Sequence, residues 1–310
     1  MTSKTFVSGT TIDSAWLNDV NGATYNGTGV FTQAGTGAIA RTVQDKARES
    51  VSVLDFGADP TGVADSYSAF VAAITSFPEQ SNSLDSASYS NAGMLVIPPG
   101  TYYLSQTLKL TRNLYIRGAS GPDGNSFGAT RLIFPAATDG IIVYNTATSS
   151  TGKGADGSIL EGFSMYPVGY TGATAPTLGT NNGIWLRGRA RIKDVMIAGF
   201  NNNGLQVVAS VGGGGALEGN ANSWEADGLR LLQNGGNGLY VSGADANAGS
   251  ATRIDASNNG GWGILDSSFL GNTYVAAHTA SNTLGPYKTT NINAANIFLG
   301  CYSESGQGTG

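Results

Sequence analysis

Acidic side chains are the residues of this sequence most able to do chemistry. Two carboxyl groups held close together can act as a general acid and a general base, or one of them can act as a nucleophile. Glu225 and Asp227 stand two residues apart in the segment SWEAD (223–227), so they share one face if that segment is a strand. Together with Asp245 and Asp255, which follow further along the chain, they are the candidate catalytic residues.

An alternative interpretation gives these acids a purely electrostatic role. Arg230 and Arg253 stand near them in the sequence, and each acid can be a solvent-facing residue that balances an arginine. Asp266 and Glu304 follow apolar runs and are expected at corners, where carboxylates accept hydrogen bonds from backbone N–H groups. Linear spacing does not decide between the two interpretations, because only the fold can bring the acids together.

Composition excludes several classes of protein. Only 12% of the 310 residues are charged and the net charge is −5, which argues against a general nucleic-acid binder, because such a protein needs a basic face. No segment approaches the ~20 apolar residues that span a bilayer, and the N-terminus lacks the apolar core of a signal peptide. We therefore expect no membrane insertion, and synthesis in a cytosol. One cysteine and one histidine give no basis for a metal site, and no cofactor is expected.

Short β runs alternate with Asn and Gly along the second half of the chain. Examples are RLIF (131–134), GIWL (183–186), IKDVMI (192–197), NGLQVV (203–208) and GWGIL (261–265). The unit recurs roughly every 20 to 35 residues, a period typical of stacked coils. Asn and Gly are expected at the corners, since both tolerate positive φ. The pattern predicts an all-β protein with a parallel β-helix over residues 121–310.

A different pattern precedes these coils. The apolar residues of 67–77 recur at helical spacing, and two segments that read as strands, 51–56 and 101–110, lie on either side of that helix in the sequence. We expect residues 49–120 to form the start of the β-helix and its capping α-helix.

Specific strings support this fold. The sequence RTVQDKARESVSVLDFGADPTGVADS (41–66) resembles the start of bacteriophage tailspike and capsule-depolymerase proteins with a pectate-lyase-like right-handed β-helix. MLVIPPGTYYLS (94–105) resembles the first full strand of that fold. The stretches 234–249 and 258–279 resemble coils of such proteins, and VSGTTIDSAWLNDVN (7–21) resembles a virion-anchoring N-terminus.

The resemblance implies a homotrimer on a phage tail that binds a surface polysaccharide of a bacterial host, which many members hydrolyse or cleave by elimination. In the family, coils continue past a segment like GCYSESGQ (300–307). An open end of a solenoid exposes an unpaired strand edge. We therefore expect the coils to continue in a longer native chain, or another chain to cover them.

Under this resemblance the four candidate acids become candidates for glycoside hydrolysis, which needs two carboxyl groups about 5 to 9.5 Å apart. Hydrolysis is favoured over elimination, and whether the chain is an enzyme stays open. Aromatic rings can serve as platforms for sugars, and arginines that alternate along one strand face can hold an acidic glycan or pair with acids on neighbouring coils. The candidate glycan-binding residues are Trp224, Trp262, Tyr240, Arg187 and Arg189, the two arginines forming a row with Arg191 and Lys193.

Residues 1–48 contain too few apolar side chains for the sequence to predict a hydrophobic core of their own. Ile12, Trp16, Leu17 and Val20 recur at helical spacing. This amphipathic stripe can dock onto phage tail or adaptor proteins, or pack against the other chains of a trimer. We expect the segment to attach the protein to the virion.

The sequence leaves two functions open for this chain. In the first, the chain is a tail-spike or tail-fibre component of the virion that presents its β-helix for recognition of a polysaccharide at the host cell surface, with or without its depolymerisation. In the second, it is a structural adaptor or stalk of the tail without catalytic activity.

Overall fold

The computed structural model describes residues 7, 9, 14–25, 28–77, 93–121, 127–144, 154–209, 219–292 and 294–304. The chain divides into two compact units, Met1–Val51 and Ser52–Gly310. No helix in these ranges is both long and apolar enough to span a lipid bilayer.

The first unit contains two helices and a small sheet. Helix α1 (Ser14–Tyr25) carries three residues of the predicted stripe: Trp16 and Val20 are half-buried, and Leu17 is exposed. Ile12 lies outside the described residues. Strand β1 (Val30–Phe31) pairs antiparallel with β2 (Arg41–Thr42), and α2 (Val43–Ala47) follows, its N-terminus capped by the hydroxyl of Thr42.

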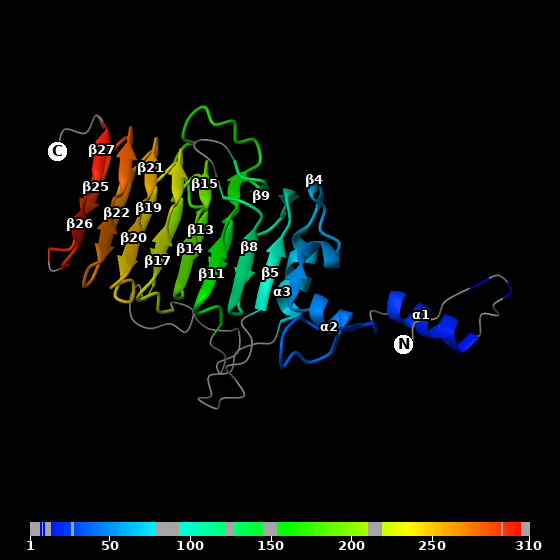
Figure 1. Cartoon of the computed structure of the whole chain (residues 1–310). Coiled ribbons are helices and arrows are strands. Elements are labelled where there is room, and N and C mark those ends of the chain that lie inside the picture. Colours follow the sequence, from blue (N-terminus) through cyan, green and yellow to red (C-terminus); the bar gives the residue numbers. More distant parts are fainter. Residues whose placement is uncertain are drawn as a thin grey trace. The chain divides into compact units, whose positions relative to one another are not determined.

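The second unit is a right-handed parallel β-helix, as the sequence predicts (Figure 1). From β7 onward each coil contributes one strand to each of three sheets, and the two turns before it contribute strands to two sheets only; equivalent strands of successive coils pair in parallel. Sheet I contains β7 (Leu108–Leu110), β10 (Ile141–Val143), β13 (Ile184–Leu186), β16 (Leu205–Val208), β19 (Leu239–Gly243), β22 (Trp262–Ser268) and β25 (Gly285–Thr289).

Sheet II contains β3 (Ser50–Ser52), β5 (Gly93–Ile97), β8 (Leu114–Gly118), β11 (Ser158–Glu161), β14 (Ala190–Lys193), β17 (Glu225–Asp227), β20 (Ser250–Thr252), β23 (Thr273–Val275) and β26 (Ile297–Leu299). Sheet III contains β4 (Thr61–Asp65), β6 (Gly100–Tyr103), β9 (Thr130–Phe134), β12 (Ser164–Pro167), β15 (Met196–Ala198), β18 (Arg230–Leu232), β21 (Asp255–Ser257), β24 (His278–Ala280) and β27 (Tyr302–Glu304).

The core is built from inward columns, because alternate residues of a strand point to opposite faces and equivalent positions stack from coil to coil. One column of sheet II is buried over seven strands: Leu95, Ile116, Leu160, Ile192, Ala226, Ala251 and Tyr274. Inward positions therefore take mainly apolar side chains and charge falls mostly on outward positions, which explains the low charged fraction of the chain.

In most coils two corners turn on a residue with left-handed backbone. Between sheets II and III, positive φ recurs at Gly162, Asp194, Gly228, Arg253, Ala276 and Gly300. After sheet III it recurs at Gly199, Gln233, Asn258 and Ser281. The expectation that Asn and Gly occupy such corners is therefore only partly correct. Stacked backbone hydrogen bonds hold these positions, as from Asp194 N to Asp227 O at 2.9 Å, and they offset the strain of a residue with a Cβ atom.

Asparagines stabilise the corners mainly through their side chains. The carboxamide of Asn259 accepts a hydrogen bond from the backbone N–H of Asn234 at 2.9 Å, and that of Asn282 accepts one from Asn259 at 3.0 Å. All three residues are buried. The ladder satisfies backbone donors that no strand pairing covers at the bend.

A short helical segment begins the second unit. Residues 51–56, expected as a strand, instead end β3 and continue as the 3₁₀ helix η1 (Val53–Phe56), because Ser52 and Asp55 form a reciprocal capping box. Helix α3 (Tyr67–Thr75) confirms the expected capping helix and buries Phe70 and Ile74. The strand expected over 101–110 is broken into β6 and β7, since a corner intervenes.

Candidate functional site

A groove lies on the outer face of sheet III. Its volume is about 490 Å³, within the range of small-molecule and saccharide sites. The floor comes from outward side chains of β15, β18, β21 and β24, and one wall is the connection that follows β12. The lining residues are Phe127, Tyr170, Thr171, Gly172, Met196, Leu232, Gln233, Asp255, Ser257, Asn258, His278 and Ala280.

One end of this sheet III groove is apolar and aromatic. Phe127 and Tyr170 pack against Met196 and Leu232. The ring centroids of Phe127 and Tyr170 are 6.1 Å apart in an edge-to-face arrangement. Tyr170 lies over Gly199, where a Cβ atom would be only 2.2 Å from its ring. The glycine thus lets the wall approach the sheet.

Hydrogen bonds fix the same wall to the floor. The hydroxyl of Tyr170 donates to Oε1 of Gln233, and Nε2 of Gln233 donates to the carbonyl oxygen of Gly172 at 2.7 Å. Burial raises the pKa of Tyr170 above its usual value, which keeps the hydroxyl protonated as a donor. A second cavity of about 330 Å³ shares Tyr170 and Thr171 with the groove.

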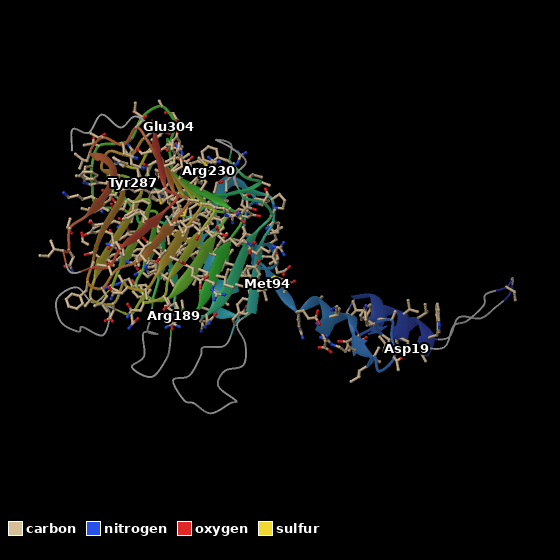
Figure 2. The ribbon with its side chains drawn as sticks, turned by 60° about the vertical axis from the view of Figure 1, so that its left-hand side comes forward. Asp19, Met94, Arg189, Arg230, Tyr287 and Glu304 are labelled. Atoms are coloured by element: carbon tan, nitrogen blue, oxygen red, sulfur yellow. The ribbon has the colours of Figure 1, made fainter. Side chains whose placement is uncertain are left out.

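The other end of the groove is polar. Asp255 on β21 forms an ion pair with Arg230 on β18, with 3.0 Å between Oδ2 and the guanidinium nitrogen. Its other oxygen, Oδ1, accepts a hydrogen bond of 2.5 Å from Ser257 and lies 3.2 Å from Nδ1 of His278 on β24. Glu304 on β27 lies beyond the histidine, with its Oε2 4.0 Å from Nε2. In Figure 2, Arg230 and Glu304 both lie at the upper side of the β-helix, and Arg189 lies at the lower side.

The four candidate catalytic acids do not converge. Glu225 and Asp227 share the outer face of β17 in sheet II, where Glu225 pairs with Arg191 at 3.0 Å and Asp227 pairs with Arg253 at 2.6 Å. Asp245 accepts hydrogen bonds from the side chains of Asn220 and Asn222 at a corner. Of the four acids, Asp255 alone lines the sheet III groove.

Trp224 is not a sugar platform, and this expectation was wrong. Its side chain is fully buried, and it packs against Gly249, where a Cβ atom would lie 2.1 Å from the indole nitrogen. Trp224 lies one residue before β17, so the alternation that turns Glu225 outward turns Trp224 into the core.

The other candidate glycan-binding aromatic residues lie on sheet I, away from the groove. Trp262 on β22 is half-buried, and the ammonium group of Lys288 lies 5.7 Å from the centroid of its ring. Tyr240 on β19 is half-buried on the outer face of the same sheet. Neither residue lines the sheet III groove.

The predicted row of basic residues does not form one strand face. Arg187 follows β13 in sheet I, where its guanidinium lies 4.8 Å from the ring centroid of Trp185. Arg189 stands at the next corner and donates to the carbonyl oxygen of Asn222 at 3.0 Å. Only Arg191 and Lys193 share the outer face of β14. The corner at Gly188 divides the row, because the chain changes sheets there.

Sequence reasoning assigned no binding role to several groove residues, above all His278, Gln233 and Tyr170. The sequence feature that could have identified the polar end of the groove is the coil period: Arg230 and Asp255 are 25 residues apart, and Asp255 and His278 are 23 apart. Such spacing places residues side by side only once the strand register is known. Asp266, expected at a corner, is instead fully buried within β22. Among the described residues, no three His, Cys, Asp or Glu side chains converge as a metal site would require.

Solved structures of phage proteins resemble this fold. ORF18 of Geobacillus virus E2 matches 89% of this chain and 55% of its own at 15% identity, with a TM-score of 0.61. The pre-mature gene product 12 of bacteriophage phi29 matches 84% of this chain and 34% of its own at 15% identity, with a TM-score of 0.50.

The phiAB6 tailspike, solved in complex with oligosaccharides of Acinetobacter baumannii surface polysaccharide, matches 84% of this chain and 49% of its own at 13% identity, with a TM-score of 0.50. The chain thus spans about half or less of the length of these three proteins. At such identities the likeness concerns the fold. No curated protein sequence matches the chain.

One family model covers more than half of the chain. It is described as "Rhamnogalacturonase A/epimerase, pectate lyase-like" and matches residues 50–214, which run from β3 through the coils to β16. The chain therefore belongs to this pectate-lyase-like family of β-helix proteins.

Proposed function

We propose that this chain is a tail-spike component of a bacteriophage, and that it binds a bacterial surface polysaccharide in the sheet III groove. Three phage proteins share its fold, and one of them was solved with oligosaccharides of a bacterial surface polysaccharide. We also propose that residues 1–48 attach the chain to phage tail or adaptor proteins, and that the protein works as a homotrimer at the host cell surface.

The groove itself carries the proposal. Sugars present apolar C–H faces and hydroxyl groups, and the groove offers a surface for each: the rings of Phe127 and Tyr170 at one end, and the imidazole of His278, held by Asp255, at the other. Asp255 and His278 are held on paired strands of the floor, and Tyr170, on the connection after β12, is fixed by its hydrogen bond to Gln233.

The exposed position of Leu17 on α1 supports the attachment role, because an apolar side chain left at the surface is available to a partner protein. The first unit is compact in itself. Under this proposal, α1 contacts the virion and the β-helix contacts the polysaccharide.

Binding is tested with a substitution that fills the groove without removing any of its polar groups. Ala280 lines the groove near His278, so Ala280→Trp should block it. Val275 lies on the same coil but faces outward from sheet II, so Val275→Trp is the matched control. Binding of both variants to purified capsular polysaccharide and O-antigen of the virus's host would be measured by surface plasmon resonance.

Loss of binding in Ala280→Trp, with binding kept in Val275→Trp, is the expected result. Equal binding by both variants would remove the groove from the proposal. Failure of the folded wild-type chain to bind either polysaccharide would overturn it and favour the structural adaptor. New reducing ends or unsaturated uronate absorbance in the same samples would show that the chain also cleaves its ligand, by hydrolysis or by elimination respectively.

A further inference from the structure

Four residues of sheet III form one outward column. Arg230, Asp255, His278 and Tyr302 occupy the same register position on the successive strands β18, β21, β24 and β27. Neighbouring strands lie about 4.8 Å apart, so each side chain touches the next. The single histidine of the sequence thus lies between a carboxylate and a phenol ring at the polar end of the groove.

Both oxygens of the Asp255 carboxylate are occupied. Arg230 holds Oδ2, and Oδ1 receives the hydroxyl of Ser257 and faces Nδ1 of His278. Asp255 is less than one quarter exposed, and Ser257 is buried. The carboxylate therefore has a fixed orientation, and its remaining role is to orient the imidazole.

The contact to Asp255 determines which nitrogen of His278 carries the proton. A carboxylate without its proton only accepts hydrogen bonds, so the 3.2 Å contact requires a proton on Nδ1. The ring also packs nearly parallel to that of Tyr302, with centroids 5.6 Å apart and 19° between the planes. In the neutral ring the lone pair is then on Nε2, and the ring is held against rotation.

Nε2 has no hydrogen bond to any described residue. Its nearest charged neighbour, Oε2 of Glu304, lies 4.0 Å away, which is beyond hydrogen-bond distance. Glu304 is more than half exposed and accepts a hydrogen bond of 3.1 Å from the hydroxyl of Tyr302. His278 itself lines the groove and is about one third exposed.

We propose that Nε2 of neutral His278 accepts a hydrogen bond from a hydroxyl group of the bound polysaccharide, with Asp255 as the residue that positions the ring. This inference rests on the proposed function and assigns a residue to its specificity: a sugar with a free hydroxyl at this point binds, and one that carries an O-alkyl group there does not. The site resembles a carboxylate–imidazole pair in which the second nitrogen is left to act on a ligand.

The proposal fixes the direction of the hydrogen bond. In the neutral ring Nε2 accepts and the sugar hydroxyl donates, whereas a second proton on Nε2 would reverse the bond, because a hydroxyl oxygen can also accept. The charged and titratable groups that face the ring are Asp255, Tyr302 and Glu304, with Arg230 behind Asp255; the hydroxyl of Tyr287, on β25, donates to the backbone oxygens of Ala277 and Tyr302.

The first experiment needs no polysaccharide. Because the chain has one histidine, ¹⁵N-histidine labelling of the full chain gives a single imidazole in NMR spectra. The expected spectrum at high pH is that of the Nδ1–H tautomer. Asp255→Asn should shift the tautomer ratio, whereas Glu225→Gln, an outward acid of sheet II that pairs with Arg191, should not. A predominant Nε2–H tautomer in the wild type would overturn the proposal.

The second experiment uses the polysaccharide that binds in the test of the groove. Its addition should shift the Nε2 resonance, and His278→Phe should weaken binding by at least about tenfold. Binding that leaves the Nε2 resonance unmoved and is unchanged in His278→Phe would refute the role of His278 while leaving the proposed function intact. Absence of any binding would instead refute the proposed function, and this assignment would fall with it.

Discussion

The hydroxyl of Tyr274 on β23 donates a hydrogen bond of 2.5 Å to Oδ2 of Asp266 on β22, and both side chains are fully buried inside the coils. Burial, together with the neighbouring Asp266 carboxylate, raises the pKa of Tyr274 well above its usual value, so the phenol stays a donor. Asn272 donates to the same carboxylate oxygen at 3.0 Å. A buried carboxylate is tolerated here because donors surround it.

Tyr274→Phe should therefore destabilise the β-helix. It removes one donor from a buried carboxylate while keeping the ring that packs against Phe298. The expected loss is about 1–3 kcal/mol in the free energy of unfolding, measured by urea denaturation. Tyr302→Phe is the control, because its hydroxyl is exposed, and its effect should stay within about 0.5 kcal/mol. Equal effects of the two substitutions would contradict the account of Asp266.

Acid stability should depend on Asp59. Its carboxylate accepts hydrogen bonds from the backbone N–H groups of Ala64, Thr61 and Val63 and from the hydroxyl of Thr61, and these bonds lower its pKa to about 2. A lowered pKa in the folded state means that the stabilisation is complete above the unfolded value of about 3.9 and is lost as the pH falls toward 2.

Asp59→Asn should thus lower the stability at pH 6 and flatten its decline between pH 4 and about 2, measured by thermal unfolding at each pH. Glu225→Gln, which changes an exposed acid of sheet II, should keep the wild-type slope in that range. An unchanged slope in Asp59→Asn would show that the bonds to Asp59 do not contribute to acid stability.

Gly271 should tolerate no side chain. Its φ is +113°, and a Cβ atom there would lie 2.6 Å from the backbone of Ala295. Gly300 also has positive φ, at +63°, but nothing lies within 4 Å of its Cβ position. Gly271→Ala should cost more than about 3 kcal/mol, and Gly300→Ala only about 1 kcal/mol, in chemical denaturation. Similar costs would mean that backbone conformation alone, and not the close contact, selects glycine at Gly271.

Deletion of residues 1–48 should separate attachment from binding. The β-helix is a compact unit that starts at Ser52, so the truncated chain should keep its circular dichroism spectrum and its polysaccharide affinity. Virions assembled with it should lack the protein, as judged by immunoblotting of purified particles. Leu17→Asp, a single change on the exposed side of α1, should reduce incorporation in the same assay. Normal incorporation of the truncated chain would refute the attachment role.

Several features could be predicted from the sequence because they depend on local pattern. Alternation of apolar and polar residues, with Asn and Gly between short runs, predicted the parallel coils. The stripe in residues 67–77 predicted α3. These signals are strong because every coil must repeat the same solution: an apolar side chain inward, a polar one outward and a tight corner.

The residues of the site could not be predicted, because local sequence pattern does not show where each strand starts or how the strands are aligned. Trp224 and Glu225 are neighbours in the sequence, yet one is in the core and the other is at the surface, because successive side chains of extended backbone point to opposite faces. Arg187 and Arg191 alternate in the sequence but belong to different sheets, since a corner separates them. A shift of one residue in where a strand starts reverses which side chains can meet a ligand.

The sequence by itself determined the β-helix, its cap and the scarcity of charge. These follow from a requirement that repeats with each coil: apolar side chains for the core and residues that allow a tight corner. The tertiary structure decided which charged residues became neighbours. Asp255 meets His278, 23 residues away, only because the one turn of chain between their strands has a length that brings the two residues into register. Coil length is set by the corners and loops and not by the strands, so the strand pattern carries no information about which polar residues the stacking of coils aligns.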